Sequence, residues 1–531
     1  MSYALAALAG VLSFLAYPFW IVDPPSGPTE WLSLPALIFV AGAPFWLVVL
    51  REPSRGRRFR LGWLTGFIHL VGMQNWISGT LVSMSHFPGW GAFLGMLAYA
   101  AFAGLPWAFL GLMARPAREL IGPGMFVALP TAAALLEHYA PVLFPFHTSN
   151  AFFEHPFMIQ TADLIGIAGV SALIHAVNLL LAETWAARSE RRPIPRRPLI
   201  AIGALWTLAL GYGALRERGL ADVAEARSIE VLLVQPNMTV DEKNSDDTKV
   251  REVVWARTAQ QTWRAVGSQP PDLVVWPEGG FPLTYLPGPN PEKPNRAQRF
   301  SERLRHFAGK LGVDFITGGL GSAVDNRASN TAMFFPKGRQ GEPERYLKQQ
   351  LLLFGESVPF ADTFPALRDA IPGMSHHVAG TSFATWTVAG LKFAPTICYE
   401  AIFSGFARDA LAAGDADVLL NVTNDVWFGH SPAPIQHLMV QQPRAIEARR
   451  WLVRSTNTGI TALIDPTGTI VTRTGLDEAT SVRASLSIPV PIATLWMPVG
   501  DAPLVILGAA CAAWAFWRRR ALGRPGPQKP A

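Results

Sequence analysis

Long apolar runs alternate with short polar connections over the first part of the chain. The runs lie near residues 3–22, 31–50, 61–80, 90–113, 121–143, 157–185 and 198–215, and one more lies near 501–517. Each is close to the roughly 20 apolar residues that a helix needs to cross the hydrocarbon of a bilayer. The pattern predicts eight transmembrane helices, seven before a long polar region and one after it.

Apart from the long polar region after the seventh span, lysine and arginine are confined to alternate connections and to the tail. The connections after the first, third and fifth spans contain neither residue. The basic residues follow the second, fourth, sixth and eighth spans: Arg51, Arg55, Arg57, Arg58 and Arg60; Arg115 and Arg118; Arg188, Arg191, Arg192, Arg196 and Arg197; Arg518, Arg519, Arg520, Arg524 and Lys529. Because basic loops stay in the cytoplasm, we expect cytoplasmic termini and an extracytoplasmic region of about 218–490. This topology explains the pI of about 9.4 without a nucleic-acid partner.

Several polar side chains fall inside the predicted spans. Glu137 and His138 lie near the outer end of one helix, and Asp163 lies near the start of the next. Ionisable groups inside a membrane are functional candidates by default. Hydrogen bonding between helices is the alternative explanation, and the sequence leaves both open.

The pattern changes from about Ser228. Short apolar runs rich in β-branched residues alternate with longer segments of helical periodicity. The expected strands are 229–235, 272–278, 313–319, 330–335, 392–400 and 417–425, and the expected helices include 246–266, 297–311, 402–413 and 434–449. Continuous apolar strands are typical of sheets covered on both faces. The region therefore predicts a layered α/β domain.

Composition supports a membrane protein and excludes several classes of site. Half of the 531 residues are apolar and only 16% are charged, which is low for a soluble chain of this length. The two cysteines, Cys398 and Cys511, stand in unrelated settings and give no disulfide framework. The histidines are scattered, without metal-ligand spacing, and there is no glycine-rich phosphate loop. We expect neither a metal nor a cofactor.

Three expected strand ends carry reactive side chains. Glu278 ends "VVWPE", Lys348 stands in "YLKQQ", and Cys398 ends "PTIC". A carboxylate can take the proton of a thiol, and a lysine can stabilise the oxyanion of a tetrahedral intermediate. The start of the helix after Cys398 would also favour a thiolate. The set is complete for acyl transfer, although each residue alone is also compatible with a structural role.

The same segments carry a resemblance to a known family. "WPEGGFP", "LKQQLLLFGESVPF", "TICYE" and "LLNVTNDVWFG" occur in the order of the nitrilase superfamily, which has a Glu–Lys–Cys triad. Several spans before such a domain and one after it resemble the apolipoprotein N-acyltransferase family, as does the stretch 424–468. The resemblance covers nearly the whole chain. It implies an αββα sandwich on a polytopic helical membrane protein.

The resemblance also implies a reaction. Cys398 would attack an ester of a membrane phospholipid, with Glu278 as general base and Lys348 holding the oxyanion. The acyl group of the resulting thioester would pass to the α-amino group of the S-diacylglyceryl cysteine of an apolipoprotein, the last step of lipoprotein maturation. Glu356 and Glu400 would have supporting roles, either orienting Lys348 or holding the amine. Trp427 and Phe428 would line the acyl or headgroup region, and core packing is the alternative for these two residues.

The expected organisation is a transmembrane region at 1–217, a catalytic domain at 218–490 on the periplasmic side of a bacterial inner membrane, and a last helix with a basic tail at 491–531. Loops 281–292 and 358–375 are predicted lids. A membrane-tethered amidase acting on a soluble amide is the first alternative, but a tether needs only one span. A transporter or receptor with an inactive domain is the second, and the intact triad argues against it.

Overall fold

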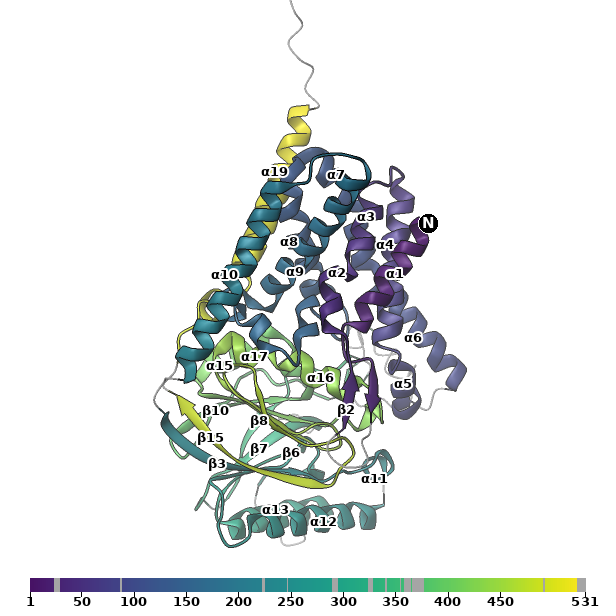
Figure 1. The fold of residues 1–531 in the computed structure, drawn as a ribbon. Coiled ribbons are helices and arrows are strands. Elements are labelled where there is room, and N and C mark those ends of the chain that lie inside the picture. Colours follow the sequence, from purple (N-terminus) through teal and green to yellow (C-terminus); the bar gives the residue numbers. More distant parts are fainter. Residues whose placement is uncertain are drawn as a thin grey trace, which may run out of the picture.

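The computed structural model describes residues 1–22, 29–85, 88–221, 225–245, 247–288, 295–322, 328–339, 341–353, 355–357, 364, 377–489 and 492–522. The chain forms two parts. Helices from the two ends of the sequence make up one part, and the middle of the sequence forms a layered α/β part against one end of them (Figure 1). This is the division that the hydrophobic pattern predicts.

The helical part follows the expected apolar runs with different boundaries. Its helices are α1 (Ser2–Leu15), α2 (Ile38–Ala41), α3 (Ala43–Val49), α4 (Arg55–Met73), α5 (Ile77–Ser85), α6 (Gly89–Ala103), α7 (Leu105–Ile121), α8 (Met125–Tyr139), α9 (Ala162–Ser189), α10 (Arg196–Ala221) and α19 (Ala502–Leu522). The last of these packs against α8 and α7.

Some predicted spans are interrupted. The first does not reach residue 22, because Trp20–Val22 is strand β1, antiparallel to β2 (Glu30–Leu32). Gly104, followed closely by Pro106, separates α6 from α7 within the predicted span 90–113. Apolar periodicity does not detect such breaks, because both sides of a break remain apolar.

Three stretches of the described chain are long and apolar enough to cross a membrane. They are Gly89–Tyr139, which includes α6, α7 and α8, then Ala162–Ser189 and Arg196–Leu220. Ser2–Leu15 and Pro35–Val49 are shorter apolar helices. The outer faces of α10 and α19 expose large apolar side chains, including Ile200, Leu208, Leu215, Ile506, Phe516 and Trp517. An apolar outer surface is what a helix facing lipid requires.

Two mixed sheets form the centre of the α/β part. The first has the order β15-β3-β4-β6-β7-β8, with β5 beside β6: β3 (Glu225–Gln235), β4 (Leu273–Val275), β5 (Phe281–Tyr285), β6 (Asp314–Ser322), β7 (Ala328–Phe335), β8 (Glu344–Leu347) and β15 (Thr480–Pro489). The second has the order β14-β13-β12-β11-β10-β9: β9 (Trp386–Val388), β10 (Leu391–Ile397), β11 (Val418–Thr423), β12 (Trp451–Thr456), β13 (Ala462–Ile464) and β14 (Ile470–Arg473). In each sheet the three central strands are parallel.

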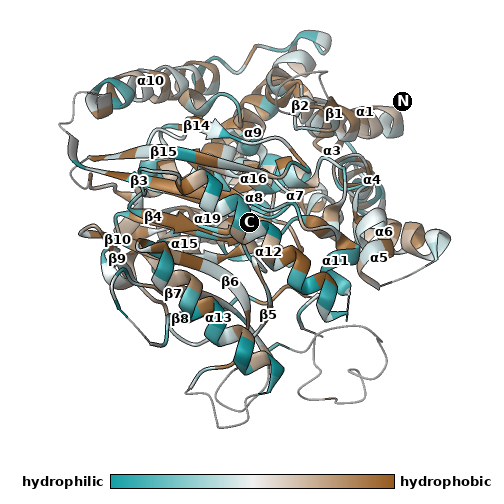
Figure 2. Cartoon of the chain, turned by 90° about the horizontal axis from the view of Figure 1, so that it is seen from below, coloured by the Kyte–Doolittle hydropathy of each residue, from teal (hydrophilic) through white to brown (hydrophobic). Residues whose placement is uncertain are grey.

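Three apolar cores stack these sheets into four layers. One core lies between the sheets and includes Val231 and Ile316 from the first sheet and Phe393 and Leu420 from the second. A second joins the first sheet to α12 (Thr248–Val266) and α13 (Arg296–Leu311). A third joins the second sheet to α15 (Ser404–Gly414), α16 (Ala433–Gln441) and α17 (Pro443–Ala448), and continues into the helical part. The strands are largely apolar, whereas α12 and α13 carry hydrophilic residues outward (Figure 2). The predicted αββα sandwich is confirmed.

One predicted lid is in part a strand. Residues 281–285 form β5, with Phe281 and Tyr285 buried against α12 and α13. Alternation of buried and half-buried positions along β5 marks it as a part of the sheet. Residues 289–292 of that predicted lid lie outside the described residues, and so does the second predicted lid, 358–375, apart from Phe364.

Buried polar contacts attach the α/β part to the helices. Arg449, after α17, donates from Nε to Asp163 Oδ2 on α9 at 2.9 Å, and both side chains are fully buried. Gln160 accepts two further bonds from this guanidinium, and Arg216 of α10 donates to the same Asp163 oxygen. On the other side of the junction, Gln436 of α16 accepts from the Trp76 indole at 2.9 Å. The two parts are therefore fixed against each other.

We expect Asp163→Ala to lower the stability of the whole protein. The change leaves Arg449 as a buried cation without its counterion, which typically costs about 3–5 kcal/mol. Thermal unfolding in detergent measures the effect. Glu119→Ala, which breaks an exposed ion pair with Arg115, is the control and should cost at most about 1 kcal/mol. Equal melting temperatures for the two variants would exclude Asp163 as an anchor.

Candidate functional site

The three reactive strand ends come together at one end of the sandwich. Glu278 follows β4 and Lys348 follows β8 in the first sheet, whereas Cys398 follows β10 in the second. Lys348 Nζ lies 4.0 Å from Glu278 Oε1, and the Cys398 thiol interacts electrostatically with both side chains. The sandwich thus joins residues that are up to 120 positions apart in the sequence into one site.

The two carboxylate oxygens of Glu278 differ in their hydrogen bonding. Its Oε1 accepts from Asn330 Nδ2 at 2.6 Å, whereas Oε2 is buried and has no hydrogen-bond partner among the described residues. Gly318 of β6 lies directly against the Glu278 backbone, where a Cβ would overlap its Cα. The free oxygen is suited to take a proton.

Lys348 is held as a buried cation. Only 1% of the residue is exposed, and Nζ lies 2.8 Å from Glu356 Oε2. Burial alone would lower the pKa of Lys348, but the carboxylates of Glu356 and Glu278 raise it well above its usual value. Burial likewise opposes ionisation of Glu356, yet Lys348 holds the pKa of that carboxyl well below its usual range. The lysine is therefore charged and cannot act as a base.

Glu356 fixes the direction of this lysine. Its Oε2 also accepts from the Leu352 backbone N–H at 2.9 Å, and its Oε1 accepts from Asn330 Nδ2 at 2.7 Å. Asn330, on β7, thereby bridges Glu356 and Glu278. The supporting role of Glu356 in orienting Lys348 stays a prediction.

Cys398 stands in a strained turn. Its φ is +51°, a left-handed conformation that non-glycine residues adopt only where surrounding contacts impose it. The residue opens the short 3₁₀ helix η5 (Cys398–Ile402) directly after β10. Its carbonyl accepts from Asn421 Nδ2 at 3.1 Å and from Gln441 Nε2 at 3.3 Å. These two bonds hold the backbone of the turn in place.

The setting of Cys398 does not favour a thiolate at rest. Burial, followed by the nearby Glu278 carboxylate, raises the pKa of this thiol to about 12, although Lys348 acts in the opposite direction. The stabilisation of a thiolate by the start of the following helix stays a prediction. Near this thiol, Glu278 Oε2 is a proton acceptor without a hydrogen-bond partner among the described residues.

Glu400 is buried and connects the loop after Lys348 to the loop that carries Cys398 through hydrogen bonds. It accepts four hydrogen bonds, three from backbone N–H groups and one from a phenol: Ile397 N at 2.7 Å, Gln349 N at 2.6 Å, Gln350 N at 3.1 Å and Tyr346 Oη at 2.8 Å. Burial raises the pKa of Glu400 to about 7, and the backbone donors oppose that shift. Because these donors surround both oxygens, the geometry supports positioning of the Lys348 and Cys398 loops and leaves no oxygen for an amine.

Aromatic side chains from both parts of the chain form an apolar wall beside the cysteine. Phe428 packs on Trp76 with ring centroids 5.0 Å apart, and Phe144 packs on Tyr399 at 5.6 Å. Phe144 also meets Phe428 at 6.0 Å. Trp427, the preceding residue, lies instead under the ammonium of a lysine, described below. Phe428 therefore belongs to a wall that the helices and the sandwich build together.

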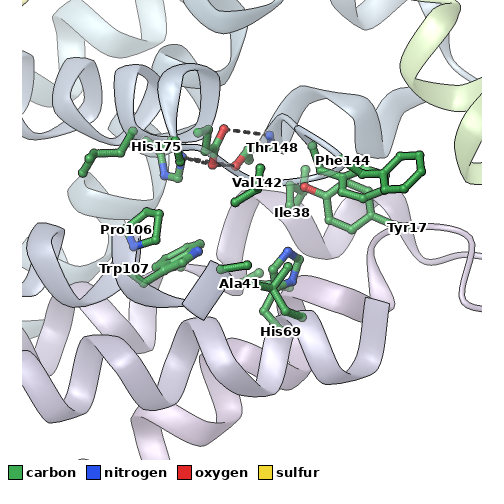
Figure 3. Close-up of a pocket in the computed structure, with 18 of the residues that line it drawn as sticks. Tyr17, Ile38, Ala41, His69, Pro106, Trp107, Val142, Phe144, Thr148 and His175 are labelled. Atoms are coloured by element: carbon green, nitrogen blue, oxygen red, sulfur yellow. Dashed lines mark hydrogen bonds and ion pairs between the residues drawn. The ribbon is translucent and has the colours of Figure 1, made fainter. Parts of the chain in front are cut away.

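The candidate residues inside the helices have structural partners. Glu137 accepts from the Thr148 backbone N–H at 2.9 Å and from His175 Nε2 at 2.7 Å, beside a cavity of about 70 Å³ whose walls include Tyr17, His69 and Trp107 (Figure 3). His138 contacts Asp501 at 3.1 Å and His147 at 2.9 Å. With Asp163 paired to Arg449, all three polar residues contribute contacts between elements. The cavity includes none of the three reactive side chains.

Several residues of the site were not predicted from the sequence. Asn330 begins an expected strand, and Asn421 and Gln441 lie within an expected strand and an expected helix, but neutral amides carry no reactive signal of their own. Lys243, in α11 (Val240–Asn244), also interacts electrostatically with Glu278 and Cys398. Only the fold reveals that proximity. Within the described parts of the chain, no three His, Cys, Asp or Glu side chains gather as metal ligands do.

Comparison with known proteins covers both parts. The carbon-nitrogen hydrolase family model matches residues 233–489, and the apolipoprotein N-acyltransferase N-terminal domain model matches residues 5–180. Among solved structures, an amidase of the nitrilase superfamily from Nesterenkonia AN1 is 18% identical, with a TM-score of 0.37, over 54% of this chain and 98% of that one.

Curated relatives span nearly the full length. Apolipoprotein N-acyltransferase of Azotobacter vinelandii is 31% identical over 96% of this chain and 98% of its own length. The protein of the same name from Bdellovibrio bacteriovorus is 30% identical over 89% and 86%, and that from Allorhizobium ampelinum is 32% identical over 84% and 85%. With both of its parts matched, this chain belongs to the apolipoprotein N-acyltransferase family.

Proposed function

We propose that this protein transfers a fatty acyl chain from a membrane phospholipid to the N-terminal α-amino group of the S-diacylglyceryl cysteine of apolipoproteins. One observation carries the proposal: the Glu278, Lys348 and Cys398 side chains converge beside an aromatic wall that the helical part completes. A soluble amide would need no such wall. A lipid acyl chain needs an apolar surface that continues into the membrane part.

The first half-reaction forms a thioester. Cys398 Sγ attacks the ester carbonyl of the phospholipid while Glu278 takes the thiol proton, and Lys348 stabilises the oxyanion. Collapse of the tetrahedral intermediate breaks the bond to the glycerol oxygen. Glu278 returns the proton to that oxygen, which releases a lysophospholipid. Glu356 keeps Lys348 in place throughout.

The second half-reaction uses the same groups in the reverse direction. The neutral amine of the lipoprotein attacks the thioester carbonyl, and Glu278 accepts one amine proton. Lys348 again stabilises the oxyanion. The carbon–sulfur bond then breaks, and the departing Cys398 sulfur takes the proton from Glu278. The amide leaves and the free thiol is restored, so the scheme is ping-pong and needs no cofactor.

Eight crossings and a periplasmic catalytic domain complete the proposal. The alternating arginines, the three long apolar stretches and the apolar outer faces of α10 and α19 support a transmembrane region at 1–217, a catalytic domain at 218–490 and a final crossing at 491–531. In this topology the site lies at the periplasmic surface of the inner membrane, where both lipid substrates are anchored. A reporter fused after Arg520 should be active only on the cytoplasmic side, and a periplasmic signal there would refute this topology.

Mass spectrometry of the intact protein tests the reaction. After incubation with phospholipid alone, we expect one added acyl group on Cys398 and an equal amount of lysophospholipid. A later addition of diacylglyceryl-modified lipopeptide should remove that group and yield the N-acylated peptide. If a lipopeptide product formed while the protein never carried an acyl group, the two-step scheme would be wrong.

A further inference from the structure

Lys243 is a second lysine near the reactive side chains. Its Nζ lies 4.2 Å from the centroid of the Trp427 ring, a cation–π distance. The side chain is partly buried and interacts electrostatically with Glu278, Cys398 and Glu356. Trp427 itself is fixed, because Ser83 of α5 donates to its carbonyl at 2.9 Å. The ammonium is thus held near the reacting atoms by an aromatic platform.

The short helix that carries Lys243 is firmly placed. Thr239 caps α11 and forms reciprocal hydrogen bonds with Glu242, at 3.3 and 3.0 Å. Glu242 in turn accepts two bonds of 2.9 Å from the Arg257 guanidinium on α12. The carboxylate next to Lys243 in the sequence is therefore already neutralised by another residue. The position of Lys243 is therefore not set by an ion pair with Glu242.

Lys243 lacks an anion of its own in the described parts of the chain, where no carboxylate oxygen lies within 4.0 Å of its Nζ. Glu356 is committed to Lys348 and Asn330. Burial lowers the pKa of Lys243, and the more distant Glu278 carboxylate opposes that shift. A partly desolvated cation beside a catalytic centre is suited to bind an anionic group of a substrate.

We propose that Lys243, on its Trp427 platform, binds the phosphodiester of the acyl donor. The inference rests on the proposed function and assigns a subsite to its first substrate. Only the glycerol unit separates the reacting ester of a phospholipid from its phosphate, so a cation near Cys398 lies within reach of that phosphate. The phosphodiester is common to all glycerophospholipids, and such a contact recognises the donor whatever its headgroup.

The same cation treats the second substrate differently. The acceptor amine is positively charged when protonated, and Lys243 repels it in that form. The neutral amine, which is the nucleophilic form, is not repelled. One residue thereby favours the phospholipid in the first half-reaction and the reactive amine in the second.

The experiment compares two donors in single-turnover acylation of the full-length protein in detergent. One donor is phosphatidylethanolamine mixed with phosphatidylglycerol, and the other is p-nitrophenyl palmitate, an acyl ester without phosphate. Lys243→Gln should raise the apparent KM for phospholipid about 10- to 100-fold, the range for loss of a charged hydrogen bond, while acylation by the nitrophenyl ester stays within about twofold. Lys243→Arg should restore phospholipid use. Lys310→Gln, at an exposed position of α13, is the matched control.

Three outcomes separate this inference from the proposed function. An equal loss with both donors would overturn the phosphate assignment, because it would mean that Lys243 acts on the catalytic groups. Unchanged kinetics with both donors would overturn it as well. Failure of the wild-type protein to form an acyl adduct from phospholipid, with normal acylation by the nitrophenyl ester, would instead refute the proposed donor and with it the inference.

Discussion

Cys398→Ala should abolish acyl-enzyme formation and acyl transfer while leaving the protein folded. The neighbouring Lys348 cannot act as the nucleophile in its place, because it is held as a cation by Glu356. We expect a loss of at least about a thousandfold in transfer, as for removal of a covalent nucleophile. Alanine keeps the Cβ that the turn at φ +51° already accommodates. The melting temperature should therefore change little.

Cys511 provides the internal control for this prediction. It lies on α19, away from the sandwich, and is the only other cysteine of the chain. Cys511→Ala should keep wild-type transfer and the full mass increase after incubation with phospholipid. Transfer at the wild-type rate by the Cys398→Ala protein would remove the thioester from the mechanism. An acyl group found on Cys511 would remove Cys398 from it.

Changes at Glu278 and Lys348 should block the first half-reaction but move the reactivity of the thiol in opposite directions. Loss of one oxyanion donor typically costs about 10²–10³ in rate, so Lys348→Ala should show no acyl adduct on the timescale of normal turnover. Glu278→Gln should fail as well, because an amide cannot take the thiol proton. If the alanine variant does not fold, Lys348→Arg replaces it in the same measurement, because arginine can keep the ion pair with Glu356.

Iodoacetamide distinguishes the two roles, because it reacts with the thiolate and needs neither an oxyanion donor nor a carbonyl substrate. The Glu278 carboxylate raises the pKa of Cys398 and Lys348 lowers it. Glu278→Gln should therefore alkylate faster than wild type at pH 7 to 9, and Lys348→Ala more slowly. In wild type, the rate should still rise with pH across this interval, since the pKa of about 12 lies above it.

Two results would contradict these roles. Normal acylation of Lys348→Ala by phospholipid, with failure only after addition of the amine, would mean that the lysine serves the second half-reaction alone. Slower alkylation of Glu278→Gln would mean that the carboxylate supports the thiolate instead of opposing it, and that a different group receives the proton.

Six strands of the sandwich and its main helices could be predicted from the sequence. These elements, such as β10 and α13, lie within a few residues of the expected ranges, because a run of apolar residues between polar turns reports burial on both faces. The strands β5, β8, β9 and β12 to β15 were not predicted. Most of them have only three to six residues, which carry too little periodicity to be distinguished from a loop. The longer β15 was missed because its apolar positions alternate with polar ones and form no continuous run.

Within the site, the sequence supplied the charged and nucleophilic residues and missed the groups that position them. Glu278, Lys348, Glu356 and Cys398 stand in motifs that indicate their chemistry. Asn330 does not, although it bridges the two carboxylates, and Lys243 resembles an ordinary surface lysine until α11 is placed beside Trp427. Glu400 was predicted as a supporting residue, but its four donors became visible only in the folded chain.

By itself, the sequence determined the division into a helical part and a layered α/β part, the order of the reactive motifs and the family. These properties depend on local composition and periodicity, which are the same whatever position a segment takes in the folded protein. The tertiary structure alone decided that one Glu278 oxygen has no hydrogen-bond partner among the described residues, that the Cys398 thiol lies near both Glu278 and Lys348, and that Asp163 anchors Arg449 across the junction. Each of these depends on burial and on partners from distant segments, because the charge state and direction of a buried polar group are set by whatever surrounds it after folding.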